Sequence, residues 1–176
     1  MAQRRPVKLP GMRAYLEEVT QVTAQEAATQ IVERLISLGP WYSGQFARNW
    51  EVRLGDTAIP ATVEPPEKRG ERTPREEVNL PTIPSLRGTG SKKVVGYTID
   101  NRTTYRRIAM DLEPGRTESA QQISAPKDWY VNFIQGGGLS KVLKNSVGAA
   151  AKNPRVRGFK AKGTNQSLIG PLELII

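Results

Sequence analysis

Residues 13–38 have the sequence RAYLEEVTQVTAQEAATQIVERLISL, and their pattern sets the architecture of the whole chain. Apolar side chains recur there at steps of three and four residues, whereas most charged and amide side chains fall on other faces. The apolar stripe comprises Tyr15, Leu16, Val19, Val22, Ala27, Ile31, Leu35 and Leu38. This spacing predicts one long amphipathic helix that packs against a core. Gly39-Pro40 follows directly and predicts its end.

Two short strands are predicted further along the chain. Trp50, Val52 and Leu54 alternate with charged residues, and the stretch 94–101 alternates apolar with polar residues in the same way. A period of two is typical of strands with one buried face.

Shorter helical segments follow the second strand. Helical spacing predicts one from Tyr105 to Leu112, then an aromatic-faced turn or two near Trp129, which the glycines at 136–138 interrupt. Ser140 is predicted to cap a further helix that runs to about Lys152. Its apolar side is expected to hold Leu139, Val142, Leu143 and Val147. The predicted fold class is therefore α+β: a small, antiparallel-rich sheet packed against a long N-terminal helix and a C-terminal helix, with extended arms.

A length of 176 residues fits one domain with arms. We expect an N-terminal arm at 1–12, a core domain at 13–152, and a basic extension at 153–176 that ends in an apolar strand. Residues 60–84 carry six prolines and few apolar side chains. An insertion at about 56–93 is therefore predicted to be an extended arm, with a partner subunit as the expected cause of any order in it.

The composition excludes several kinds of chemistry. The chain has no Cys and no His, so it cannot hold a thiol nucleophile, a histidine base or a Cys/His zinc site. The glycine clusters at 88–92 and 136–141 lack the Gly-Lys-Ser/Thr ending of a P-loop. The carboxylates at Asp56, Asp100, Asp111 and Asp128 are scattered. We therefore predict no enzymatic activity, no cofactor and no metal site.

Positive charge is concentrated in one block. The chain has 26 Lys and Arg against 17 Asp and Glu, a net charge of +9. The stretch 129–172 contains no acidic residue and holds seven cations. Such a block either contacts a polyanion or is a solvated tail. From charge alone, the candidates for contact with nucleic acid or an acidic partner are Lys141, Lys144, Lys152, Arg155, Arg157, Lys160 and Lys162.

Membrane contact and secretion are not expected. The longest apolar run falls far short of the roughly 20 residues that cross a bilayer. Residues 1–11 are basic and are not followed by the apolar stretch of a secretory signal.

Three short islands within residues 13–152 resemble the small neck or tail-completion proteins of tailed bacteriophages. The first island is the turn and strand at 41–52, the second runs from 97 to 115, and the third is Ala125-Pro126 before the last helix. In the first, Ser43-Gly44 stands where that family has Thr-Gly. The residues that carry the resemblance are Ser43, Gly44, Arg48, Trp50, Asn101, Tyr105, Leu112, Glu113, Gly115 and Pro126. The long proline-rich insertion, the glycine break at 136–138 and the extension after Pro154 depart from the family pattern.

The resemblance implies a structural virion protein, assembled in the host cytoplasm. It implies a homo-oligomeric ring that joins the head connector to the tail and surrounds the DNA channel. Its partners would be identical subunits, neighbouring connector or stopper proteins, tail-terminator or tail-tube proteins, and double-stranded genomic DNA that passes without sequence readout.

Two alternatives remain open from the sequence. One is a small basic nucleic-acid-binding module with a disordered tail, which the charge block favours. The other, supported by fewer features, is a metal-dependent hydrolase that uses carboxylates only.

Overall fold

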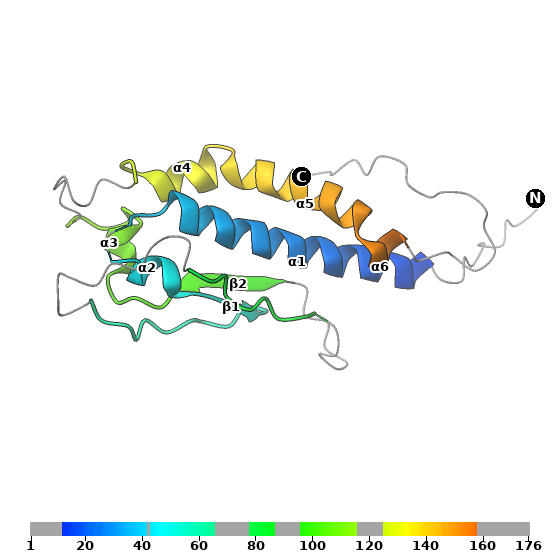
Figure 1. Ribbon diagram of the computed structural model, residues 1–176, viewed down its shortest axis with the longest axis horizontal. Coiled ribbons are helices and arrows are strands. Elements are labelled where there is room, and N and C mark those ends of the chain that lie inside the picture. The colour runs from blue at the N-terminus through cyan, green and yellow to red at the C-terminus, as the bar shows by residue number, and fades with distance from the viewer. Residues whose placement is uncertain (1–11, 42, 66–77, 87–95, 116–124, 158–176) are drawn as a thin grey trace, which may run out of the picture.

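The computed structural model describes residues 12–41, 43–65, 78–86, 96–115 and 125–157. Its elements are α1 (Met12–Leu38), α2 (Gln45–Arg48), β1 (Trp50–Leu54), β2 (Tyr97–Asn101), α3 (Arg106–Ala109), α4 (Trp129–Gln135), α5 (Gly138–Lys152) and α6 (Pro154–Arg157). Helix α1 runs lengthwise between two layers, with α4 and α5 along one side and the two strands on the other (Figure 1). The predicted α+β fold class is confirmed.

Helix α1 spans almost the predicted range, but its burial differs from the predicted single stripe. Leu16 is 50% exposed and Leu38 is 38% exposed, although both were expected in the core. Ala28 and Val32, which lie outside the predicted stripe, are buried. The reason is that α1 contacts α5 and both strands, so its buried surface extends around the helix.

The two strands pair antiparallel, with Trp50 opposite Asn101 and Leu54 opposite Tyr97. Trp50 and Val52 are buried, as their alternation predicts. The first residues of the predicted second strand, at 94–95, lie outside the described residues.

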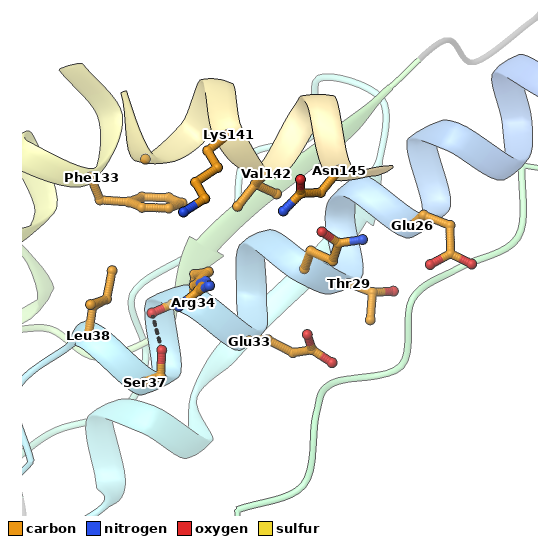
Figure 2. Close-up of a pocket in the computed structure, with 12 residues that line it drawn as sticks. Glu26, Thr29, Glu33, Arg34, Ser37, Leu38, Phe133, Lys141, Val142 and Asn145 are labelled. Carbon is orange, nitrogen blue, oxygen red and sulfur yellow. Dashed lines mark hydrogen bonds between the residues drawn. The ribbon is translucent and has the colours of Figure 1, made fainter. Parts of the chain in front are cut away.

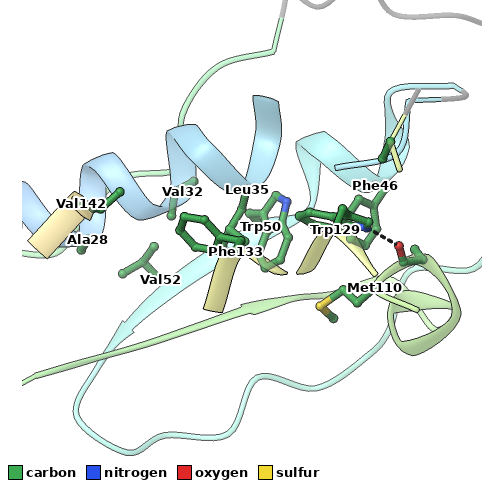
Figure 3. Packing of buried hydrophobic residues seen from close by; sticks show 12 residues of the cluster. Ala28, Val32, Leu35, Phe46, Trp50, Val52, Met110, Trp129, Phe133 and Val142 are labelled. Atoms are coloured by element: carbon green, nitrogen blue, oxygen red, sulfur yellow. Dashed lines mark hydrogen bonds between the residues drawn. The ribbon is translucent and has the colours of Figure 1, made fainter. Parts of the chain in front are cut away.

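Aromatic rings fill the centre of the core, between α1, the strands and α4 (Figure 3). The ring of Phe46 meets that of Trp50 edge to face at 5.4 Å between centroids, and meets that of Trp129 similarly at 6.4 Å. The indole Nε1–H of Trp129 donates to the carbonyl oxygen of Ala109 at 2.9 Å. A second, smaller cluster joins Val22 of α1 to the end of α5 and to α6.

The corner between α4 and α5 corrects one prediction. Gly137, with φ +88°, is the residue that precedes α5, and Ser140 lies inside the helix instead of capping it. A positive φ favours glycine, which explains why the glycine run sets the start of the helix.

Burial along α5 and the extent of α3 also differ from expectation. Val142 is buried as predicted, whereas Leu143 is 44% exposed and the small residues Ser146 and Ala150 are buried instead. Helix α3 ends at Ala109, short of Leu112, and Asp111 nearby has a positive φ of 58°.

The described parts of the predicted insertion, residues 56–65 and 78–86, are irregular and extended but pack on their own core. Ile59 and Leu86 are buried, and Val63 forms a parallel bridge with Thr103. These described residues therefore contact the core of their own chain, and the expected role of a partner subunit in ordering the insertion stays a prediction. The predicted extension after residue 152 begins with helix α6, in which Val156 is buried. The predicted N-terminal arm apart from Met12, and the predicted C-terminal strand, lie outside the described residues.

Candidate functional site

The first two resemblance islands meet at Asn101, whose side chain is completely buried. Its Nδ2 donates to the carbonyl oxygen of Phe46 at 2.7 Å, and its Oδ1 accepts from the backbone N–H of Thr103 at 3.0 Å and from the Thr103 hydroxyl at 2.8 Å. One amide thereby holds helix α2 to the end of β2. We call Ser43–Trp50 and Asn101–Tyr105 together the motif junction.

Tyr105 strengthens the motif junction from the other side. Its ring lies 6.4 Å from that of Phe46, and its hydroxyl donates to Oε1 of Gln45 at 3.3 Å. Burial raises the pKa of Tyr105 to about 12. The phenol therefore stays neutral at physiological pH and acts as a packing and hydrogen-bonding group.

The other first-island residues shape the turn into α2. Gly44 has φ +77°, and the buried Ser43 hydroxyl accepts from the backbone N–H of Gln45 at 3.3 Å. Trp50 is buried, whereas Arg48 is exposed. Most of this island thus has a structural role in the fold.

The remaining resemblance residues do not join the motif junction. Leu112, Glu113, Gly115 and Pro126 are exposed, and Glu113 forms an ion pair with Arg107. The segments that contain them are connected instead by their neighbours: Asp111 Oδ2 accepts from the backbone N–H of Asp128 at 2.9 Å.

The arginines near the sheet are engaged in internal contacts. They hold the extended segment at 57–64 in place: Arg53 Nη1 donates to Ala58 O (2.9 Å), Arg106 Nη1 to Ile59 O (3.1 Å) and Arg102 Nη2 to Thr62 Oγ1 (3.0 Å). Arg53 and Arg102 also contact Glu51, and Arg106 lies 3.2 Å from an oxygen of Asp100. These cations are largely neutralised by the fold, so they contribute little to a free basic surface.

The cations of α5 and α6 are placed differently. Lys141, Lys144, Lys152 and Arg157 are exposed, and within the described part of the chain none of them is in an ion pair. The three lysines fall within about 80° around α5 and span about 16 Å along it. We call these three lysines and Arg157 the basic face.

Arg155, unlike the basic face, forms an ion pair within the fold. Nε of Arg155 lies 2.9 Å from Oε1 of Glu18, whose side chain is only 10% exposed. This ion pair ties α6 to α1, so Arg155 has a structural partner. Lys160 and Lys162 lie outside the described residues.

Among the described residues, no cluster of three or more acidic, His or Cys side chains could hold a metal ion. Within those same ranges, no helix combines the length and apolar character needed to span a membrane. The glycines at 136–138 separate α4 from α5, and the cluster at 88–92 is not described.

Comparisons with known proteins find no counterpart. A scan against protein-family models gives no match, and searches of curated proteins and of solved structures give none either.

Proposed function

We propose that this chain is a structural, non-enzymatic subunit of the neck of a tailed bacteriophage. Identical copies would form a ring that joins the head connector to the tail and surrounds the genome. The observation that carries the proposal is the motif junction. Its halves lie about 50 residues apart in sequence, yet they share the hydrogen bonds of Asn101.

This convergence supports the family resemblance because the residues of two short, separate sequence similarities contact one another in the folded chain. Asn101 and Tyr105 of the second island bond to the backbone of Phe46 and the side chain of Gln45 in the first. Residues with such roles preserve a subunit's shape, which is what a ring component has to supply. The packing and hydrogen bonds of the motif junction account for its residues without any catalytic role.

The basic face supports the DNA-related part of the proposal. Exposed lysines on one side of a helix can neutralise phosphates without reading bases. A channel that the genome must pass through requires contacts of this kind, because tight or sequence-specific contacts would hold the DNA in place.

The proposal is tested by measuring the mass of the purified full-length chain at increasing concentration, with electron microscopy of the same samples. Growth from monomers to one closed ring supports the proposal. Because neighbouring neck proteins can be needed to nucleate such a ring, the measurement is repeated with particles that lack this chain. A monomer that neither self-assembles nor joins those particles contradicts the proposal.

The basic face also favours a second candidate, a small nucleic-acid-binding module. A salt titration of binding to free duplex DNA separates the two functions. A binding module should hold DNA at low salt and lose affinity steeply as salt rises. A neck subunit should bind free DNA weakly at every salt concentration and still assemble.

A further inference from the structure

An open groove of about 770 Å³ runs between α1 and α5, separate from the motif junction (Figure 2). Glu26 and Glu33 line its α1 wall, and Lys141 and Asn145 line its α5 wall. Leu38 and Phe133 make one end apolar, the end farthest from Glu26 in Figure 2. The full lining is Glu26, Thr29, Gln30, Glu33, Arg34, Ser37, Leu38, Phe133, Gly138, Lys141, Val142 and Asn145.

The charges in this groove are not used by the fold. Glu26, Glu33, Arg34 and Lys141 all lack an ion-pair partner within the described ranges. A groove lined by uncompensated charges of both signs is complementary to an extended chain that also carries both signs and some apolar residues.

We propose that residues 158–176 of the same chain bind in this groove. Their charged residues are Lys160, Lys162 and Glu173. Their larger apolar residues are Phe159, Leu168, Ile169, Leu172, Leu174, Ile175 and Ile176. The segment thus supplies cations for the two glutamates, a carboxylate for Arg34 or Lys141, and apolar side chains for the end of the groove.

The starting point of the segment is fixed next to α1. Arg155 pairs with Glu18, and Val156 packs in the cluster that contains Val22. The chain therefore leaves α6 close to residues 18–22 of α1. At 1.5 Å per residue, Glu26 lies about 12 Å and Leu38 about 30 Å farther along the helix. Residues 158–176 can span about 60 Å when extended, so the whole groove is within reach.

The order of charged and apolar residues along the segment also matches their order along the groove. Lys160 and Lys162 follow Arg157 closely, and Glu26 and Glu33 are the first charged groups of the α1 wall in that direction. The larger apolar residues are concentrated later in the segment, as Leu38 and Phe133 come at the far end of the groove. This contact lies within one chain and does not depend on the proposed phage function.

The chain has no cysteine, so a pair of introduced cysteines can report the distance between two positions without competing native thiols. The test pair is Lys162→Cys with Gln30→Cys, which places one thiol in the groove. The control pair is Lys162→Cys with Thr20→Cys, an exposed α1 position that does not line the groove and lies closer to α6 along the helix. Under mild oxidation, we expect the test pair to form an intramolecular disulfide at least about 10-fold faster than the control pair.

Equal rates for the two pairs, or faster closure of the control pair, would overturn the proposal. Disulfides that join two chains would overturn it too, and would assign the groove to the extension of a second copy. A second measurement uses the cysteine-free chain. Trypsin should cleave after Lys160 and Lys162 faster in the Glu26→Gln/Glu33→Gln variant than in Asp56→Asn/Glu113→Gln, and equal cleavage rates contradict the proposal.

Discussion

At position 101 an asparagine amide satisfies three buried polar groups at once: the carbonyl of Phe46 and the N–H and hydroxyl of Thr103. Replacing it by alanine removes the acceptor of both Thr103 groups and leaves the Phe46 carbonyl with only its 3.3 Å bond from the Asn49 N–H, while little apolar packing is lost. Unsatisfied buried groups cost about 1–3 kcal/mol each, with partial relaxation. We expect Asn101→Ala to lower the free energy of unfolding by about 3 kcal/mol, as measured by urea denaturation.

The matched control is Asn132→Ala on α4, where the asparagine side chain is exposed. That change should stay within about 0.5 kcal/mol of wild type. Equal effects of the two substitutions would show that the amide of Asn101 does not hold the motif junction together.

Tyr105 makes stability depend on alkaline pH. Burial raises its pKa in the folded protein to about 12, from a usual value of 10.0. The fold thus favours the neutral phenol, and the contribution is fully present below pH 10 and is lost as the pH rises toward 12. The phenolate would also face an acceptor, Oε1 of Gln45, in place of donating to it.

The Tyr105→Phe variant should therefore lose stability less steeply than wild type between pH 10 and 12, as measured by urea denaturation. Some dependence should persist in the variant. Burial also raises the pKa values of Tyr97 and Tyr130, and Asp100 raises that of Tyr130 further. Parallel stability curves for the two proteins would contradict this assignment.

The sequence indicated that Asn101 and Tyr105 are important but could not indicate which residues they contact. The resemblance picked out Asn101 and Tyr105, and the structure places both in the motif junction. What could not be predicted is the pairing of Asn101 with Phe46 or of Arg155 with Glu18, because those partners are 55 and 137 positions apart. No local pattern specifies contacts over such separations.

At the level of elements, the start of α5 depends on one glycine. Gly137 has φ +88°, where a Cβ is strained whatever space surrounds it, whereas Gly148 lies within the helix with nothing within 4 Å of an added Cβ. We expect Gly137→Ala to destabilise the protein by about 1 kcal/mol. Gly148→Ala should stabilise it by about 0.5–1 kcal/mol. Thermal unfolding of both variants checks the opposite signs, and a shift of the same sign in both would contradict the account.

Periodicity predicted the long elements well and the short ones poorly. The existence of α1, β1 and α5 follows from patterns of apolar residues, because each buries a regular face, whereas the start of α5 is set by Gly137. Burial on two sides of α1 was missed, since a single stripe cannot indicate that a helix lies between two layers. Helices α2 and α6 are four residues each, too short for a period to be detected. The groove between α1 and α5 arises only when the two helices pack.

For the whole molecule, the distribution of free charge matters more than the net charge of +9. Lys144 and Lys152 belong to the basic face and have no ion-pair partner among described residues. If this face contacts DNA phosphates, Lys144→Gln/Lys152→Gln should reduce the magnitude of the slope of log K against log salt by about 1.8, over the salt range in which binding is measurable. Filter binding or fluorescence anisotropy at several salt concentrations gives that slope.

The control removes the same charge elsewhere, with Arg48→Gln/Lys127→Gln, because both of these residues are exposed outside α5 and α6. We expect this variant to keep the wild-type slope to within about 0.5. Equal losses in the two variants would mean that overall charge, and no particular face, governs the interaction with DNA.

The most direct measurement is electron cryo-microscopy of phage particles produced with an affinity-tagged copy of this chain. We expect tagged protein in purified particles, as a closed ring between head and tail whose subunits surround the channel. Particles without the tagged chain, together with a monomer left free in the lysate, would contradict it.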